Sequence, residues 1–457
     1  MASSDLFVNA LLKDHRVATA KELLLAALQD GQKEICSVRP PNPNLKHSYD
    51  ETIARFSKSR GGPLWFPYLG SGIGNGPLVE LLDGSVKYDF ISGIGVHFFG
   101  HSHPALLDAS IDAALSDVAI QGHLQQNGDS VELSMLLTEA SKLPHCFLST
   151  SGAMATENAL KIAFQKNFPA QRILAFNRCF AGRTLALAQI TDKPLFREGL
   201  PPTLLVDYVP FFDPLRPEES SQETLRAIQK QISRYPKGHA AMVFELVQGE
   251  GGSYPGTSEF FIPIMQLLKE NHIAVFVDEV QTFGRTPQLF AYQYFGLQDY
   301  IDICSIGKLS QVCATLFRDE YKPKPGLLSQ TFTGGTASIR CTIAILKILL
   351  QGDFYGPGGR IARLHAFFVE KFLEIAKRHP GTVNGPFGLG GLVAFTPFDG
   401  DAEYTKKIVH ALFDEGLLCF IAGSSPTRIR MLPPFAILKE ADIIAATAII
   451  EKILIQG

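Results

Sequence analysis

Apolar and polar positions follow a regular pattern between about residues 100 and 340. Apolar β-type runs alternate there with stretches whose apolar positions have helical spacing. The expected strands are CFLST, RILAFN, LLVDYV, AAMVFELV, IAVFVDEV and IDICSIG, and the expected helices are ENALKIAFQKNF, SQETLRAIQKQISRY and SEFFIPIMQLLKENH. This alternation predicts an α/β fold with a mainly parallel sheet covered on both faces.

The pattern changes on either side of this region. Residues 60–95 are rich in glycine and aromatic residues, with strand candidates LVELL and VKYDF joined by an Asp-Gly turn. After SIRCTIAILKILLQG, helices and a glycine-rich strand region predict a smaller α+β domain. We expect an N-terminal helical segment over 1–75, a large domain over 76–345 and a small C-terminal domain over 346–457.

Composition excludes several classes of partner. The 42 basic and 45 acidic residues give a net charge of −3, without a basic cluster that would follow a nucleic-acid backbone. The start of the chain has the pattern of an amphipathic helix rather than of an export signal, and no run approaches the roughly 20 apolar residues of a membrane span. The seven cysteines lack CxxC spacing, which fits a reducing cytoplasm.

Three features suggest chemistry at strand ends, where open α/β sheets bind ligands. The turn before ENALKIAF leaves the N–H groups of Gly152 and Ala153 at a helix N-terminus, which favours phosphate binding. Taken alone, such a sequence is more often an ordinary connection between a strand and a helix. Asp278 ends a buried strand and needs a cation or a strong donor; no His or carboxylate cluster suggests a metal. Lys308 also follows a strand, and burial would lower its pKa as a Schiff-base lysine requires.

The order of the three features is more informative than any one of them. A phosphate site, a carboxylate for a pyridinium nitrogen and a lysine for an imine are what pyridoxal 5'-phosphate (PLP) needs from a protein. Over roughly residues 60–450 the chain resembles the class III, or ω-, aminotransferases of PLP fold type I. The matching blocks are SGAMATENALKIAF, FAGRT, ELVQGEGG, DEVQTFGRT, IGKLSQVCA, TFTGG and RIRMLPPF.

The resemblance implies a large domain with a mainly parallel seven-stranded sheet, and it assigns roles to individual residues. Lys308 would bond the cofactor and shuttle the proton, while Asp278 would pair with the pyridine nitrogen. The other cofactor-binding residues would be Ser151, Gly152, Ala153, Phe180, Val280, Gln281 and Thr331. Thr331 would reach the phosphate from the partner subunit, which implies a homodimer with shared active sites.

The same resemblance implies the reaction. Arg183 would bind the remote carboxylate of an amino donor, Arg430 would bind 2-oxoglutarate, and Glu250 would cover Arg430 when the donor enters. The expected reaction moves a terminal amine from an ω-amino donor to 2-oxoglutarate. ENALKIAF and GKLSQVC favour lysine as donor. Ornithine, acetylornithine, diaminobutyrate, 4-aminobutyrate, an isomerase activity on the same scaffold and a non-catalytic binding module stay open as alternatives.

The chain also departs from the family pattern. DEVQTFGRTPQ is one residue shorter than usual, FAGRT places Ala181 where a histidine is usual, and TFTGG leaves Thr331 and Thr333 as rivals for the phosphate, with a gapless count favouring Thr331. His101 and His103 in GHSHP have the spacing of a metal pair, but a structural role is favoured. These differences affect the expected substrate more than the expected cofactor.

Overall fold

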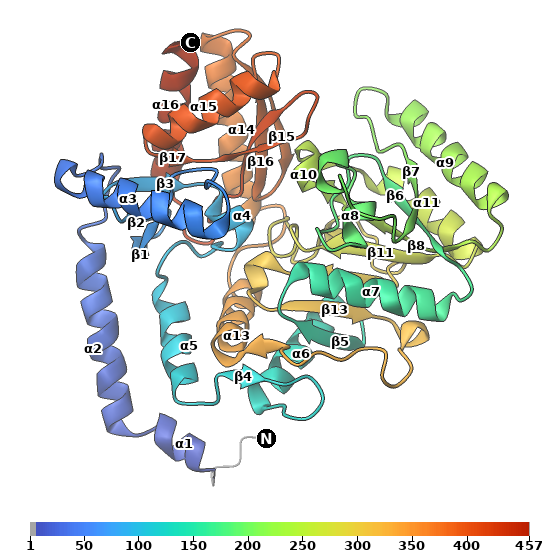
Figure 1. Cartoon of the computed structure of the whole chain (residues 1–457), viewed down its shortest axis with the longest axis horizontal. Coiled ribbons are helices and arrows are strands. Elements are labelled where there is room, and N and C mark those ends of the chain that lie inside the picture. Colours follow the sequence, from blue (N-terminus) through green and yellow to red (C-terminus); the bar gives the residue numbers. More distant parts are fainter. Residues whose placement is uncertain (1–5, 457) are drawn as a thin grey trace.

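The computed structural model describes residues 6–456, and a seven-stranded sheet lies at the centre of its larger body (Figure 1). Strand β13 is antiparallel to both of its neighbours, and the other six strands are parallel to one another. In spatial order the strands are β5 (His145–Ser149), β13 (Cys313–Phe317), β12 (Ile303–Ile306), β11 (Ala274–Glu279), β8 (His239–Phe244), β6 (Arg172–Phe176) and β7 (Leu205–Val209).

Alternate side chains of this sheet pack against two helical layers. Ile173 joins the cluster that contains helix α7 (Gly152–Lys166), whereas Leu174 and Phe176 join the cluster that contains α11 (Ser258–Glu270). The side chains point to opposite faces because the strand has a period of two. Both faces are therefore buried, which explains why the strands read as continuous apolar runs.

Further helices complete these layers. Helix α13 packs along α5, and α9 contacts β7 and α11. Their bounds are α5 (Pro104–Ala114), α6 (Gly128–Ser141), α9 (Pro217–Arg234) and α13 (Thr336–Gln351).

The six apolar runs expected to be strands all lie in this sheet, so the predicted α/β fold with a mainly parallel seven-stranded sheet is confirmed. Strand β13 was not singled out by the pattern. It follows the short turn Lys308–Ser310 almost directly, and all five of its residues are buried. An apolar run that reverses direction without a polar or glycine-rich loop gives no signal at its turn.

The C-terminal part forms a second body of antiparallel strands and helices. Its sheet has the order β15 (Val383–Leu389), β16 (Leu392–Pro397), β19 (Arg428–Met431) and β18 (Phe420–Ala422). Helices α14 (Arg360–Arg378), α15 (Ala402–Asp414) and α16 (Glu440–Gln456) belong to the same body (Figure 1). The strand Arg428–Met431 in this sheet carries Arg430.

The N-terminal residues connect to this C-terminal body. A hairpin-like sheet of β1 (Gly70–Asn75), β2 (Leu78–Leu81) and β3 (Val86–Asp89) is extended by a parallel strand, β17 (Leu417–Leu418). Trp65 packs on His410 and Phe420, with ring centroids 5.6 and 5.0 Å away. The three-segment division at residues 75 and 345 stays a prediction.

The first three helices lie at one side of the molecule, where the second contacts α5 and the third lies beside the sheet of β1, β2 and β3 (Figure 1). They are α1 (Phe7–Leu12), α2 (His15–Gln32) and α3 (Pro43–Arg60); residues 1–5 of the expected amphipathic helix lie outside the described residues. Leu23 and Leu24 of α2 are exposed. Among the helices of residues 6–456, none combines the length and apolar character needed to cross a membrane.

Candidate active site

Asp278 lies at the carboxyl end of β11, opposite Ser305 of the neighbouring strand β12. Its side chain is only 6% exposed, and its Oδ1 accepts a hydrogen bond of 2.8 Å from the Val280 N–H. The Thr156 hydroxyl lies 3.5 Å from Oδ2. Burial raises the pKa of Asp278, while the Val280 N–H and the charge of Lys308 act in the opposite direction. This carboxylate needs a cationic partner.

Lys308 lies immediately after β12 and Gly307, next to Asp278 at the same edge of the sheet. Its backbone has a φ of +54°, a left-handed conformation that is uncommon outside glycine and costs about 1–3 kcal/mol. Burial lowers the pKa of its ammonium group, and the nearby Arg430 lowers that pKa further. Lys308 therefore has the environment of a lysine that reacts as a neutral amine.

The start of α7 forms a tight glycine cradle beside these two residues. The Ser151 hydroxyl caps the helix by accepting from the Met154 N–H at 3.2 Å, and the first helical N–H groups are those of Gly152 and Ala153. A Cβ on Gly152 would lie 2.7 Å from Val280 Cγ1. This helix start therefore has no room for a side chain at Gly152 and leaves backbone donors for an anion.

Gln281 and Phe180 complete the set expected around the cofactor. Gln281 is buried, and its Oε1 has no hydrogen-bond partner within residues 6–456. The Phe180 N–H donates to Oε2 of Glu245 at 3.0 Å, and the Gly249 N–H donates to Oε1 at 3.1 Å. Burial raises the pKa of Glu245 to about 8. Sequence reasoning missed Glu245, although it follows a buried strand just as Asp278 does.

The substrate arginines have different surroundings. Arg430 is buried, and its Nη2 lies 2.6 Å from Oε2 of Glu250. The other carboxylate oxygen of Glu250 accepts from Lys193 Nζ at 2.5 Å. Lys193 was not expected, because its loop carries no motif. Burial favours the neutral acid, but Arg430 and Lys193 outweigh it and hold the pKa of Glu250 below its ordinary value.

Arg183 is exposed, and its Cζ lies 3.6 Å from the ring centroid of Phe196. Thr331 is also exposed, whereas the Thr333 hydroxyl donates to the Ile120 carbonyl at 3.2 Å. His101 Nε2 lies 2.9 Å from Oδ2 of Asp89. Of the residues expected at the site, Ser151, Arg183 and Thr331 are thus exposed, and the others are buried or partly buried.

Comparison with known proteins identifies the family. The profile of the family described as aminotransferase class-III matches residues 72–454. The chain belongs to the class III aminotransferases. These enzymes use PLP, so the protein is a PLP-dependent aminotransferase. The predicted family, enzyme class and cofactor are therefore confirmed.

Curated relatives resemble the chain over most of its length. Acetylornithine aminotransferase 1 of Bradyrhizobium diazoefficiens is 31% identical over 392 residues, which cover 82% of this chain and 89% of the relative. Acetylornithine aminotransferase of Bacillus subtilis is 31% identical over 373 residues, covering 80% and 90%.

Solved structures support the fold. Lysine aminotransferase from M. tuberculosis superposes with a TM-score of 0.78 at 23% identity, covering 88% of this chain and 98% of that one. Taurine:2-oxoglutarate aminotransferase from Bifidobacterium kashiwanohense, in complex with PLP and glutamate, gives 0.78 at 18% identity, covering 89% and 97%. At this identity the likeness concerns the fold alone.

The residues present fit PLP on three structural grounds. The buried carboxylate of Asp278 needs a cationic partner, and the protonated ring nitrogen of PLP can supply one. The start of α7 at Gly152, which lies against Val280, leaves backbone donors for a phosphate. Gln281 follows Val280 in the chain, and its buried amide oxygen has no partner within residues 6–456. Lys308 supplies the amine.

Proposed function

We propose that this enzyme transfers the terminal amino group of an ω-amino donor to 2-oxoglutarate, and that an N-acylated diamino acid such as acetylornithine is a better donor than lysine. The observation that carries the proposal is the arrangement of Glu250 between Arg430 and Lys193. A site that must accept first an amine-bearing chain and then a dicarboxylate needs a cation that can be covered and uncovered.

The reaction centre is proposed as follows. PLP, when bound, supplies an electron sink for the carbanion formed at the substrate carbon. Asp278 would keep the ring nitrogen protonated, because its buried carboxylate is most stable beside a cation. The Lys308 amine would take the proton from the substrate carbon and deliver it to the cofactor, since burial favours its neutral form.

Glu250 would distinguish the two substrates. While it pairs with Arg430, that end of the site presents no free cation and accepts an uncharged methylene chain. When a dicarboxylate enters, its carboxylate can replace Glu250 on the planar guanidinium, whose Nε and Nη1 have no partner within residues 6–456. Lys193 would then retain Glu250 and reduce the cost of leaving it unpaired.

The donor end favours an acylated substrate. Arg183 stacks on Phe196, and no carboxylate of the described chain forms an ion pair with it. A donor carboxylate can pair with this guanidinium, whereas a free α-ammonium group beside it would be repelled. An N-acetyl group removes that positive charge. The names of the curated relatives support the same choice.

We also propose a homodimer in which Thr331 serves the partner's site. The Thr333 hydroxyl is engaged with the Ile120 carbonyl, while Thr331 is exposed and available. The surface beside it is apolar: Val118 and Leu124 flank strand β4 (Ala119–Ile120), which pairs with β14 (Gly334–Gly335), and both side chains are exposed, as is Phe332. Such a patch is typical of an interface.

A donor panel tests the proposed substrates. Purified PLP-loaded enzyme is incubated with fixed 2-oxoglutarate and with acetylornithine, ornithine, lysine, diaminobutyrate or 4-aminobutyrate, and glutamate is quantified. We expect the largest kcat/KM with acetylornithine, and a loss of at least tenfold on that donor for Arg183→Gln. Higher kcat/KM for lysine or 4-aminobutyrate would reject the acylated donor, and no glutamate from any donor would reject the transfer itself.

A further inference from the structure

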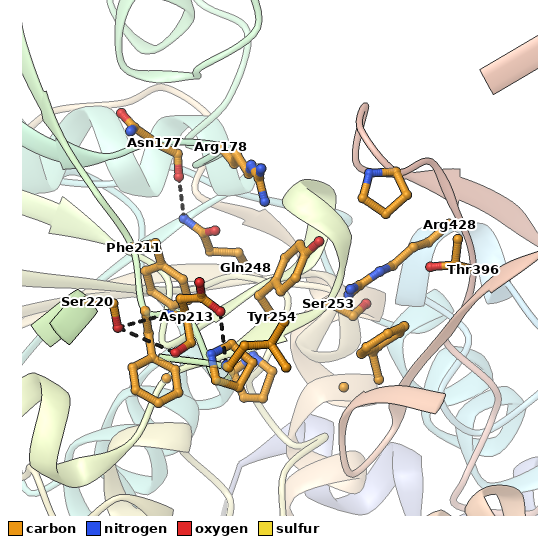
Figure 2. A pocket seen from close by; sticks show the side chains of 18 of the residues that line it. Asn177, Arg178, Phe211, Asp213, Ser220, Gln248, Ser253, Tyr254, Thr396 and Arg428 are labelled. Atoms are coloured by element: carbon orange, nitrogen blue, oxygen red, sulfur yellow. Dashed lines mark hydrogen bonds between the residues drawn. The ribbon is translucent and has the colours of Figure 1, made fainter. Parts of the chain in front are cut away.

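A large cleft lies between the two bodies of the chain, and Lys308 is not among the residues that line it. It has a volume of about 1020 Å³ and is lined on one side by residues of the 210–216 loop and of 253–257, and on the other by strands of the C-terminal sheet. Figure 2 shows Arg428 and Thr396 on one wall, with Gln248 and Asn177 on the opposite wall. None of the residues assigned to the cofactor or to the two substrates lines it.

Arg428 is an uncompensated buried cation in this cleft. Its side chain is 4% exposed, and its Cζ lies 3.9 Å from the ring centroid of Tyr254 and 3.4 Å from that of Phe387. Its Nη1 donates to the Gly252 carbonyl at 2.5 Å, but its Nε has no partner, and no carboxylate of residues 6–456 forms an ion pair with it. Burial lowers the pKa of Arg428 to about 10.

The two aromatic rings determine how this guanidinium can be approached. Both of its faces lie against Tyr254 and Phe387, so the edge that carries the N–H groups is what remains for a ligand. A planar carboxylate meets such an edge with two parallel hydrogen bonds. Arg178, whose Cζ lies 5.6 Å from the Tyr254 centroid, adds a second positive charge nearby.

The acidic residues of the cleft do not compensate Arg428. Asp213 pairs with Arg216 at 3.2 Å, and Glu223 lies 3.6 Å from the same guanidinium. The third acidic residue, Asp399, accepts from the Asp401 N–H at 3.2 Å and forms no ion pair with Arg428. Among the cleft's charged residues without an ion pair, the two cations Arg178 and Arg428 outnumber Asp399, so the balance is positive. An unpaired buried charge is destabilising unless a counter-ion reaches it.

A second buried polar group lacks a partner on the opposite wall. Gln248 is 1% exposed, and its Nε2 donates to the Asn177 carbonyl at 2.8 Å. Its Oε1 has no donor among the described residues. Such groups are normally satisfied, so this acceptor fits a ligand that carries an N–H or O–H group.

Much of the remaining lining is apolar. Phe211, Phe212, Phe387 and Phe398 lie around the cleft, which gives the body of a ligand an apolar environment. We propose that this cleft binds an organic carboxylate with an aromatic or apolar body, held by Arg428. The proposal does not depend on the proposed donor or acceptor, because none of their residues contributes to the cleft.

The cleft and the proposed substrate site are neighbours across one short helix. Arg428 and Arg430 are two residues apart on β19, so their side chains leave the same side of the strand. Both contact α10 (Gly249–Gly252), Arg430 through Glu250 and Arg428 through the Gly252 carbonyl. A binding experiment must therefore separate the two arginines.

Isothermal titration of the PLP-loaded enzyme with indole-3-acetate tests the proposal. We expect one saturable site per chain and at least tenfold weaker binding of indole-3-acetamide, which has the same body without the charge. Arg428→Gln should weaken indole-3-acetate at least tenfold, and Arg428→Lys, which keeps the charge but loses the planar fork, by an intermediate factor. Arg178→Gln, at an exposed arginine of the same cleft, should change binding about twofold.

Three results would overturn the proposal. The first is the absence of saturable binding to wild-type enzyme. The second is loss of binding in Arg430→Gln but not in Arg428→Gln, together with competition by 2-oxoglutarate, which would place the probe in the substrate site. The third is Arg428-dependent binding of inorganic phosphate without binding of indole-3-acetate. The comparison of acetate and acetamide in wild-type enzyme keeps the test decisive if Arg428→Gln does not fold.

Discussion

Arg430 Nη2 lies 2.6 Å from Glu250 Oε2, and the second oxygen of the same carboxylate lies 2.5 Å from Lys193 Nζ. Glu250 thus connects two cations that belong to different bodies of the chain. Lys193 and Arg430 compete for the carboxylate of Glu250. The balance between these two contacts therefore sets how easily Arg430 becomes free to bind a substrate carboxylate.

This competition predicts opposite effects for two substitutions. Glu250→Gln should lower the KM for 2-oxoglutarate about tenfold, or by about 1.4 kcal/mol, because the internal carboxylate no longer competes for Arg430. Lys193→Met should raise this KM several-fold, because Glu250 then has Arg430 as its remaining partner. Steady-state kinetics at saturating donor measure both values.

Lys322→Met, at an exposed lysine outside the site, provides the control and should leave the KM unchanged. Shifts of the same sign for Glu250→Gln and Lys193→Met would mean that Glu250 does not alternate between the two cations.

The glycine cradle predicts a clash that can be relieved. Gly152→Ala should place a methyl group 2.7 Å from Val280 Cγ1 and weaken PLP binding at least tenfold, as measured by equilibrium titration of the apo-enzyme. Gly128→Ala is the matched control, because Gly128 also begins a capped helix but has no atom within 4 Å of the added carbon. The same clash should lower the folding stability of Gly152→Ala, and adding Val280→Ala should restore it. If the stability of the double variant stays low, the clash with Val280 is not its cause.

The sheet could be predicted largely from the sequence because its two buried faces produce continuous apolar runs that alternate with helical segments. β13 could not be predicted, because Lys308 is followed by a tight turn rather than by a loop. The pairing of β17 with β3 could not be predicted either, because Leu417 and Tyr88 are brought together only by the packing of distant segments.

The site could be predicted where a residue type is anomalous for its position. Asp278 and Lys308 are charged groups at the ends of apolar strands, and both lie at the same sheet edge. Lys193 and Arg428 are ordinary by sequence. Lys193 becomes notable only through a contact with Glu250, 57 residues away, and Arg428 only through burial between Tyr254 and Phe387.

The proposed sharing of sites between subunits predicts complementation. Thr331→Val should weaken PLP binding by about ten- to a hundredfold, since a hydrogen bond to a charged group contributes about 1.5–3 kcal/mol. Thr333→Val is the control: it removes the bond to the Ile120 carbonyl and should lower stability without changing PLP affinity.

Mixed dimers locate the residue. A Thr331→Val chain paired with a Lys308→Ala chain should regain one intact site, and so about half of the wild-type activity per dimer, if Thr331 acts across the interface. Absence of regained activity in isolated mixed dimers would place Thr331 within its own subunit's site.

The pKa of Lys308 predicts the pH dependence of cofactor uptake. Burial and the charge of Arg430 lower this pKa. The reactive neutral amine should therefore be present at pH values below the ordinary lysine pKa of about 10.4. The rate at which apo-enzyme binds PLP, followed by absorbance, should therefore rise with pH to a midpoint below that value. Arg430→Gln removes a cation and should move the midpoint upward, whereas Asp278→Asn removes an anion and should move it downward. Because both variants meet the same free PLP, its own titration cancels in the comparison, and shifts in one common direction would contradict the electrostatic explanation.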